Sequence, residues 1–204
     1  MSEIIKIDTG KEAIVAPPKP KELLKLVKEN DPILAQTMPK FDFDNPPIDP
    51  NALASRLVDT CKQYRGLGLS ANQCGLPHRV FVMGSEDEYV AFFNPEVTHV
   101  TEQTAHMTEG CLSFPFLGLK ITRPAEIKVK YQDFTGAQKE ATFNGISARC
   151  FLHELDHMNG ILYTDKAKPL ALQMAKKKRQ KVKNLVKRFE KANKTVTTLN
   201  GNIN

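Results

Sequence analysis

The sequence has 204 residues and a formal net charge of +6, with 41% hydrophobic and 25% charged residues. These values are ordinary for one compact globular domain. No apolar run approaches the ~18 residues needed to span a bilayer, and the N-terminus lacks the apolar core of a secretory signal. Four cysteines are too few for a disulfide scaffold. We therefore expect a cytoplasmic protein without membrane contact, in a bacterium, an organelle or a virus-infected host.

The chain is expected to begin with an arm. Residues 1–20 end in Ala-Pro-Pro-Lys-Pro, a composition that indicates a flexible or draped segment before a domain of residues 21–168. Inside this domain, Asp49 and Pro50 are good N-cap and first-turn residues for a helix that reaches Tyr64. A glycine-rich loop follows that helix.

Six short runs rich in branched and aromatic residues predict β-strands, joined by turns such as residues 133–136. The predicted strands are residues 79–83, 90–94, 96–104, 119–122, 126–132 and 139–144. A helix at residues 146–158 follows, with Asn159 and Gly160 as left-handed caps. The expected fold class is α+β, with mostly antiparallel strands around this central helix.

The helix at residues 146–158 carries an HExxH pattern. His153 and His157 are four residues apart, so a helix places them on one face, about 5–6 Å apart at Cβ, where they can share a metal ion. Glu154 would then reach a water on the metal rather than the metal itself. This arrangement is typical of metal-dependent hydrolases, although two histidines can also occur by chance in a structural helix.

A catalytic metal of this kind normally has three protein ligands and one open position. No histidine follows His157, and the only later glutamate is Glu190, in a lysine-rich segment. Asp165 remains possible but lies only eight residues on. Upstream, Cys111 offers a thiolate, a strong ligand for zinc or ferrous iron. A free cysteine is, however, more often a small buried hydrophobe than a ligand.

Three segments together resemble the signature motifs of the peptide deformylases, in the same order and with similar spacing. They are GLGLSANQ at residues 66–73, EGCLS at residues 109–113 and HELDH at residues 153–157. The resemblance spans roughly residues 25–168. It implies an enzyme that removes the formyl group from the N-terminal formylmethionine of newly made polypeptides.

The resemblance implies a role for each matching residue. The implied metal ligands are Cys111, His153 and His157. Glu154 looks like the general acid and base, while the side-chain amide of Gln73 and the backbone N–H of Leu112 would donate to the formyl oxygen. Gly68 would hydrogen-bond the substrate backbone. The implied cofactor is one divalent metal per chain, natively Fe²⁺, with Zn²⁺ or Ni²⁺ able to replace it.

Two positions depart from the family pattern. The family normally has Ala where Ser70 stands, and Gln where Leu152 precedes the first histidine. Neither position carries an implied ligand or a catalytic role, though Leu152 would change the hydrogen bonding behind the site.

The face of the metal-bearing helix also predicts a substrate pocket. Positions three, four and seven residues before His153 share its face, and these are Cys150, Arg149 and Ile146. Cys150 and Ile146 would form an apolar wall suited to methionine, the side chain that the family resemblance implies. Arg149 would contribute its aliphatic stem and keep its charged head in water. Ordinary core packing is the alternative for Cys150 and Ile146.

Glu109 and Arg123 form a further predicted pair. A carboxylate two residues before a metal ligand often anchors that loop to a cation, and Pro124 holds Arg123 in an extended backbone. A solvated surface role for Arg123 is the alternative.

The C-terminal part, residues 169–204, is expected to be a basic helix and a polar tail. Residues 176–194 contain ten Lys or Arg and one acid, or +9, which leaves −3 for the rest. Apolar residues recur there at helical spacing, at Val182, Leu185, Val186 and Phe189. This pattern predicts contact with polyanions or a merely solvated helix. In bacterial deformylases such a helix docks on the ribosome. Residues 195–204 are expected to be disordered.

Two other functions remain open at this point. One is an HExxH metallopeptidase for internal peptide bonds, which would need a third ligand other than Cys111. The other is a non-catalytic ribosome- or RNA-binding protein with a structural metal, in which residues 176–194 would carry the activity. The expected substrate of the leading hypothesis is an N-formylmethionyl nascent peptide, and the expected assembly is a monomer.

Overall fold

The computed structural model describes residues 23–86 and 88–200, so the predicted arm of residues 1–20 lies outside the described residues. The helices are η1 (Pro32–Ala35), α1 (Pro50–Gln63), η2 (Ala71–Cys74), α2 (Gly145–Met158), η3 (Tyr163–Lys166) and α3 (Pro169–Asn200). The strands are β1 (Gly68–Ser70), β2 (Val80–Ser85), β3 (Glu88–Val100), β4 (Thr104–Glu109), β5 (Leu119–Pro124), β6 (Glu126–Gln132) and β7 (Gln138–Asn144).

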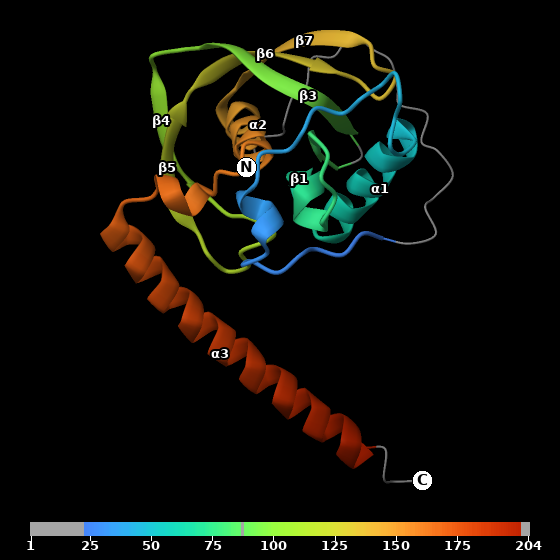
Figure 1. Ribbon diagram of the computed structural model, residues 1–204. Coiled ribbons are helices and arrows are strands. Elements are labelled where there is room, and N and C mark those ends of the chain that lie inside the picture. The colour runs from blue at the N-terminus through green and yellow to red at the C-terminus, as the bar shows by residue number, and fades with distance from the viewer. Residues whose placement is uncertain (1–22, 87, 201–204) are drawn as a thin grey trace.

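Antiparallel strands surround one central helix (Figure 1). A five-stranded sheet has the order β1-β2-β3-β6-β7, and a second sheet pairs β4 with β5. Every pair in both sheets is antiparallel. The α+β class predicted from the sequence is therefore confirmed.

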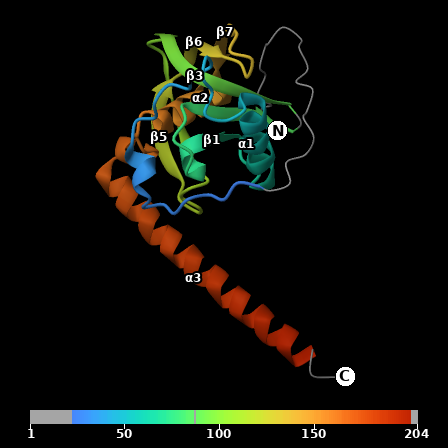
Figure 2. The same ribbon diagram turned by 45° about the vertical axis from the view of Figure 1, so that its right-hand side comes forward.

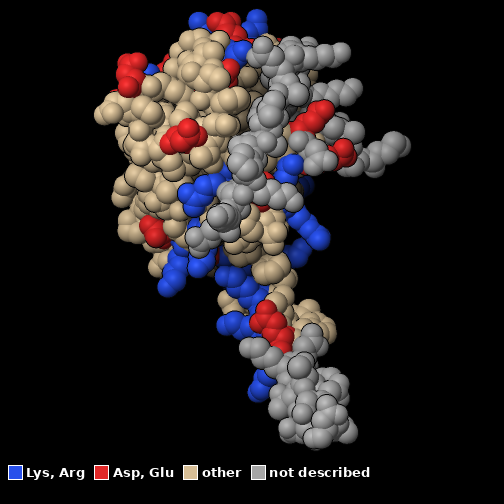
Figure 3. Space-filling model, turned by 90° about the vertical axis from the view of Figure 1, so that its right-hand side faces the viewer, with Lys and Arg blue, Asp and Glu red and all other residues tan. Residues whose placement is uncertain are grey.

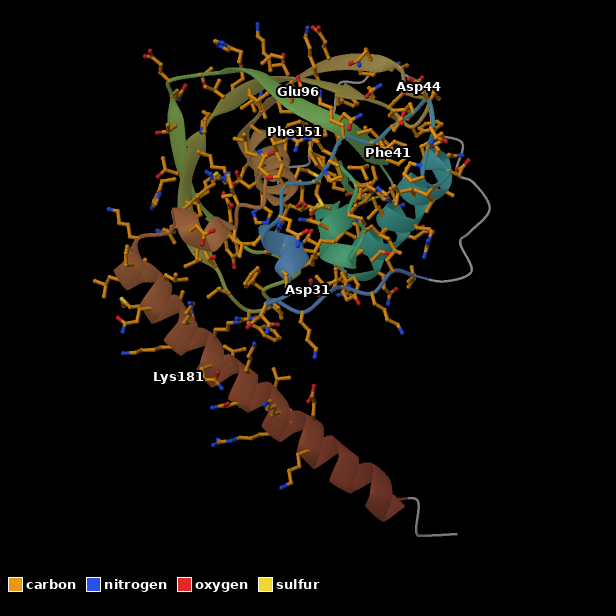
Figure 4. All side chains as sticks on the ribbon, in the orientation of Figure 1. Asp31, Phe41, Asp44, Glu96, Phe151 and Lys181 are labelled. Carbon is orange, nitrogen blue, oxygen red and sulfur yellow. The ribbon has the colours of Figure 1, made fainter. Side chains whose placement is uncertain are left out.

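Helix α2 is held in the centre by aromatic packing against the five-stranded sheet. The Phe151 ring lies 5.1 Å from that of Phe81, 5.4 Å from Phe92 and 5.5 Å from Phe143. Each of these four side chains is at most 2% exposed, and burying one contributes roughly 1.5–3 kcal/mol. Figure 4 shows Phe151 inside the body, on the helix that carries the HExxH pattern.

Helix α1 forms where the sequence predicts it. The Asp49 carboxylate accepts a hydrogen bond from the Ala52 N–H at 2.6 Å, and Pro50 occupies the first turn. The helix ends at Gln63 with Tyr64 as its C-cap. Its buried face packs on β1, β2 and β3, and this contact delivers the glycine-rich loop to the side of α2.

The strand prediction is correct in part. The run at residues 90–94 and the first part of the run at residues 96–104 form one strand, β3, which ends at Val100 rather than at residue 104. This strand is irregular between Phe93 and Glu96, and Asn94 has a φ of +48°. Strand β4 was not expected, because most of its residues are polar or half-exposed and nothing in its composition indicates a strand. Backbone pairing with β5 holds these residues in the strand conformation.

Two helix ends differ from expectation. Gly160 has the expected left-handed φ of +69°, but Asn159 has a φ of −101°, so the cap prediction for Asn159 is wrong. The Asn159 side chain instead accepts a hydrogen bond from Arg79 at 2.9 Å. At the C-terminus, residues 195–200 are helical, although disorder was expected. No Gly or Pro occurs from residue 170 to residue 200, so nothing in the sequence stops the helix.

Helix α3 leaves the body and projects away from it (Figures 1 and 2). It extends beyond the 176–194 segment at both ends, from Pro169, which suits the first turn of a helix, to Asn200. In the part of the chain that the structure describes, no helix combines the length and the apolar character that crossing a bilayer requires.

Candidate active site

Three side chains able to bind a metal converge between α2 and the loop after β4. The ligand atoms of Cys111, His153 and His157 all lie within 4.8 Å of one another. The Cys111 Sγ is 3.3 Å from the His157 Nε2. Asp165, the other candidate for a third ligand, is exposed and accepts a hydrogen bond from the Leu162 N–H. The donor set therefore suits one ion held by a thiolate and two imidazoles.

The second nitrogen of His153 is oriented by a carboxylate. His153 Nδ1 lies 3.1 Å from Glu109 Oε2, which leaves Nε2 free to face Cys111. Metal-binding histidines commonly donate their other N–H to a carboxylate in this way. Burial lowers the pKa of His157 well below its usual value, so its imidazole is neutral and has a lone pair to offer a metal.

Glu109 is the centre of a buried ion-pair network. Arg123 donates to it through Nε at 2.6 Å and Nη2 at 2.8 Å, so the predicted pair exists and the surface alternative for Arg123 is wrong. Burial raises the pKa of Glu109, but hydrogen bonds from Arg123 and His153 outweigh burial and lower the pKa to about 2. Arg123 also donates to Asp156 at 2.8 Å. The loop before Cys111 is thus tied to α2.

The environment of the Arg149 guanidinium differs from the prediction. The guanidinium is not in water: the side chain is 7% exposed, and Nη1 donates to Glu109 at 2.5 Å and to the Ile121 carbonyl at 2.9 Å. Nη2 donates to the Ala105 carbonyl at 2.7 Å. A guanidinium forks toward several acceptors at once, so Arg149 cross-links α2 to β4 and β5. Helical spacing placed the residue on the right face but could not show this charge partner.

Glu154 is buried directly behind the glycine-rich loop. A Cβ at Gly68 would lie 2.6 Å from Glu154 Oε1 and 2.9 Å from Cys150 Sγ, so a larger residue there would displace these side chains. Burial raises the pKa of Glu154 to about 7, against the opposing charge of His153. Its Oε2 is buried and has no hydrogen-bond partner among the described residues. A carboxyl in this state can exchange a proton near neutral pH.

Gln73 is held so that its amide NH₂ faces the ligand cysteine. Its Oε1 accepts from the backbone N–H of Ser70 at 2.9 Å and from the Ser70 hydroxyl at 3.0 Å. Its Nε2 donates to Ser113 Oγ at 3.0 Å and lies 3.4 Å from Cys111 Sγ. Sequence analysis gave Ser113 no role, although it is the last residue of the EGCLS motif.

A cavity of about 440 Å³ opens onto this cluster. Its lining includes Leu112, Cys111, Gly68, Gln73, Glu154 and His153. A second hollow of about 210 Å³ adjoins it and shares His153, Leu67 and residues 108–110. The three predicted pocket residues, Ile146, Arg149 and Cys150, line the second hollow. By contrast, Leu152 packs beside the aromatic core and does not line either cavity.

A thiolate, two imidazoles, a carboxyl with a raised pKa and an oriented amide donor therefore meet at one cavity. This combination defines a metal-dependent hydrolase that acts on an amide or a similar carbonyl compound.

Comparison with known proteins identifies the family. A model of the polypeptide deformylase family matches residues 23–173. A peptide deformylase of Thermotoga sp. (strain RQ2) is 39% identical over 161 residues, which cover 78% of this chain and 95% of that protein. A peptide deformylase of Rhizobium meliloti is 35% identical over 170 residues, covering 81% and 91%. The chain belongs to the polypeptide deformylase family.

A solved structure supports the same family. The crystal structure of a peptide deformylase from Synechococcus elongatus in complex with actinonin has a TM-score of 0.73 and 30% identity, and the match covers 84% of this chain and 95% of that chain. The protein is thus a metal-dependent hydrolase that removes the N-formyl group from nascent peptides. Neither the metallopeptidase nor the non-catalytic alternative is supported.

Proposed function

We propose that Cys111, His153 and His157 hold the catalytic metal, natively Fe²⁺, with Zn²⁺ or Ni²⁺ able to replace it. The observation that carries this proposal is the convergence of the three ligand atoms within 4.8 Å, together with the carboxylate of Glu109 behind His153. A divalent metal in such a site supplies a Lewis acid and makes water acidic enough to react at neutral pH. Ligand type alone accepts several metals, because selection also depends on supply.

Glu154 carries the proton in this proposal. As a carboxylate it takes a proton from the attacking water, and as a carboxylic acid it delivers that proton to the leaving amine. A pKa raised to about 7 suits both steps, because neither form is then strongly favoured. The unpartnered Oε2 is the oxygen available for this transfer.

Gln73 and the backbone N–H of Leu112 would stabilise the negative charge that collects on the formyl oxygen. The Gln73 amide is already oriented by Ser70 and Ser113, so little reorganisation is needed when the charge develops. Losing one such donor typically lowers the rate about 10² to 10³ fold. Gly68 would let the substrate backbone run close beside β1 without displacing Glu154, which a Cβ at this position would contact at 2.6 Å.

The 210 Å³ hollow would take the methionine side chain. Ile146 and Cys150 provide apolar surface there, and the stem of Arg149 adds to it. Because the Arg149 head is paired with Glu109, the hollow presents carbon rather than free charge to the substrate.

Formate release from formyl-Met-Ala-Ser tests this proposal. The protein would be assayed anaerobically with Fe²⁺ and in Ni²⁺-substituted form, beside Glu154→Gln. We expect activity in the wild type and its loss in the variant, with the metal retained. A metal-loaded wild type that leaves formyl peptides intact would contradict the proposal.

We also propose that α3 docks this enzyme on the ribosome through residues 176–194. The lysines at 177, 178, 181 and 187 are exposed, and Figure 3 shows Lys and Arg side chains along α3 and where it leaves the body. Leu185 and Phe189 are 52% and 63% exposed. An exposed basic and apolar helix fits an RNA-rich surface.

Co-sedimentation with ribosomes at increasing salt would test the docking. Changing Lys177, Lys178, Lys181 and Lys187 to Glu leaves Arg179 in place, so α3 keeps its contact with the body. We expect binding to weaken at least about tenfold and to become less salt-dependent. Unchanged binding would contradict the role of α3.

We further propose a cytoplasmic monomer whose catalytic unit is residues 21–168. Every residue of the proposed site comes from this range of one chain, so a second copy is not needed to complete it. The bacterial relatives and four free cysteines support a reducing compartment.

A further inference from the structure

The rim of the catalytic cavity contains a tight turn with an unusual residue. The Leu117 N–H donates to the Phe114 carbonyl at 3.2 Å, Pro115 occupies the second position, and Phe116 at the third has a φ of +66°. These are features of a type II turn, whose third position strongly favours glycine. A bulky side chain in this backbone conformation is rare. Strained backbone of this kind tends to occur where function requires it.

This turn is firmly held. The Pro115 carbonyl accepts from Arg179 Nε at 2.9 Å, and the Leu117 carbonyl accepts from the Tyr163 hydroxyl at 2.7 Å. Arg179 and Tyr163 are only 8% and 1% exposed. Both donors are therefore buried and ordered, and the position of Phe116 is set by the fold rather than by a loose loop.

Phe116 is nevertheless 57% exposed. It lines the 440 Å³ cavity together with Cys111, His153 and Leu67, and Leu67 is itself 48% exposed. The protein thus keeps two large apolar side chains uncovered beside the catalytic cluster. Surface of this kind at the mouth of a cleft is favoured when a ligand covers it.

The geometry points to Phe116 as the residue that selects the second residue of the substrate. This inference rests on the proposed function, in which methionine enters the 210 Å³ hollow. Side chains of an extended peptide alternate in direction. Phe116 does not line that hollow but lines the cavity beside it. In this arrangement the side chain after methionine leaves the hollow, and Phe116 on the rim of the larger cavity offers it apolar contact, so bulky apolar residues should be preferred there.

Two substrates and three variants test the inference. Formyl-Met-Phe-Ser and formyl-Met-Ala-Ser would be compared by kcat/KM in the wild type, Phe116→Gly, Phe116→Ala and Met174→Ala. Glycine suits the positive φ, so Phe116→Gly should fold, while Phe116→Ala removes the ring and keeps the strain. Met174 is 64% exposed on α3, lines neither cavity and lies outside the segment 176–194, so it is the matched control.

We expect the wild type to prefer the Phe peptide. In both Phe116 variants, kcat/KM for the Phe peptide should fall about tenfold. The kcat/KM for the Ala peptide should change less than about twofold, so the preference falls about tenfold. Met174→Ala should keep the preference. An unchanged ratio in both Phe116 variants, or an equal loss on both peptides, would overturn the inference. A wild type inactive on formyl-Met-Ala-Ser would instead refute the proposed function and, with it, the basis of this inference.

Discussion

The catalytic centre and α3 differ in the burial and pairing of their charged side chains. At the centre, Glu109, Arg123 and Arg149 are each at most 7% exposed, and both arginines pair with Glu109 through short hydrogen bonds. On α3 the charges are mostly positive and exposed, and Figure 4 shows Lys181 outside the body. Buried paired charges hold geometry but are costly to break, whereas exposed charges cost little and act at a distance. Substitutions in the two regions should therefore have separable effects.

The largest effect is expected for Cys111→Ala. Removing the thiolate leaves two imidazoles, too few to retain the metal. Metal content should fall from one ion per chain toward none, and formate release should be lost, as atomic absorption and the peptide assay would show. Cys74→Ala is the control, because Cys74 lies outside the ligand cluster. Full metal content in Cys111→Ala would contradict the ligand assignment.

Glu154→Gln should come next. The amide keeps the shape of the side chain but cannot carry the proton, so the rate of formate release should fall about 10² to 10⁴ fold. Metal content should stay unchanged, since Glu154 is not in the ligand cluster. A variant that loses its metal, or one that keeps wild-type activity, would contradict the proposed role.

Glu109→Gln should chiefly affect stability. It leaves Arg149 without its buried counter-charge and Arg123 with Asp156 alone, and breaking such a network costs about 3–5 kcal/mol. Metal affinity should also fall about 10 to 100 fold, because His153 loses its orienting carboxylate. Urea unfolding and metal titration would measure the two effects.

Glu96→Gln is the matched control for Glu109→Gln. Glu96 pairs with Lys40 at 3.0 Å, but both side chains are more than half exposed. Such a pair contributes about 0–1 kcal/mol. A comparable loss of stability in the two variants would show that burial is not what separates the two kinds of charge.

A smaller effect is expected for Ser70→Ala. The Ser70 hydroxyl is one of two donors that hold Gln73 Oε1, and the backbone N–H remains in the variant. A net hydrogen bond contributes about 1 kcal/mol, so kcat should fall about fivefold with little change in metal content. An unchanged kcat would show that the backbone N–H alone orients Gln73.

The smallest effect on catalysis is expected on α3. The variant with Lys177, Lys178, Lys181 and Lys187 changed to Glu should hydrolyse formyl-Met-Ala-Ser within about twofold of the wild type, because Arg179 still anchors the turn beside the cavity. The same variant should bind ribosomes at least about tenfold more weakly. A large loss of peptide hydrolysis would show that the two regions are not separable.

The sequence by itself determined the elements whose signals are local. Spacing four residues apart puts His153 and His157 on one helix face, and Asp49 with Pro50 starts α1. Cys111 and Gln73 were identified through the family motifs. A thiolate can bind a metal and an amide can donate a hydrogen bond, and these properties belong to the residue types themselves. The absence of Gly and Pro from residue 170 to residue 200 also marks a long helix, although disorder was expected at its end.

Only the tertiary structure decided the contacts between distant segments. Arg149 meets Glu109 across 40 residues, and strand β4 is ordered by pairing with β5 rather than by its own composition. The positive φ of Phe116 arises because the turn is bonded at both sides by donors from η3 and α3. Such contacts depend on where other elements pack, and no local pattern of residues encodes a partner that lies so far along the chain.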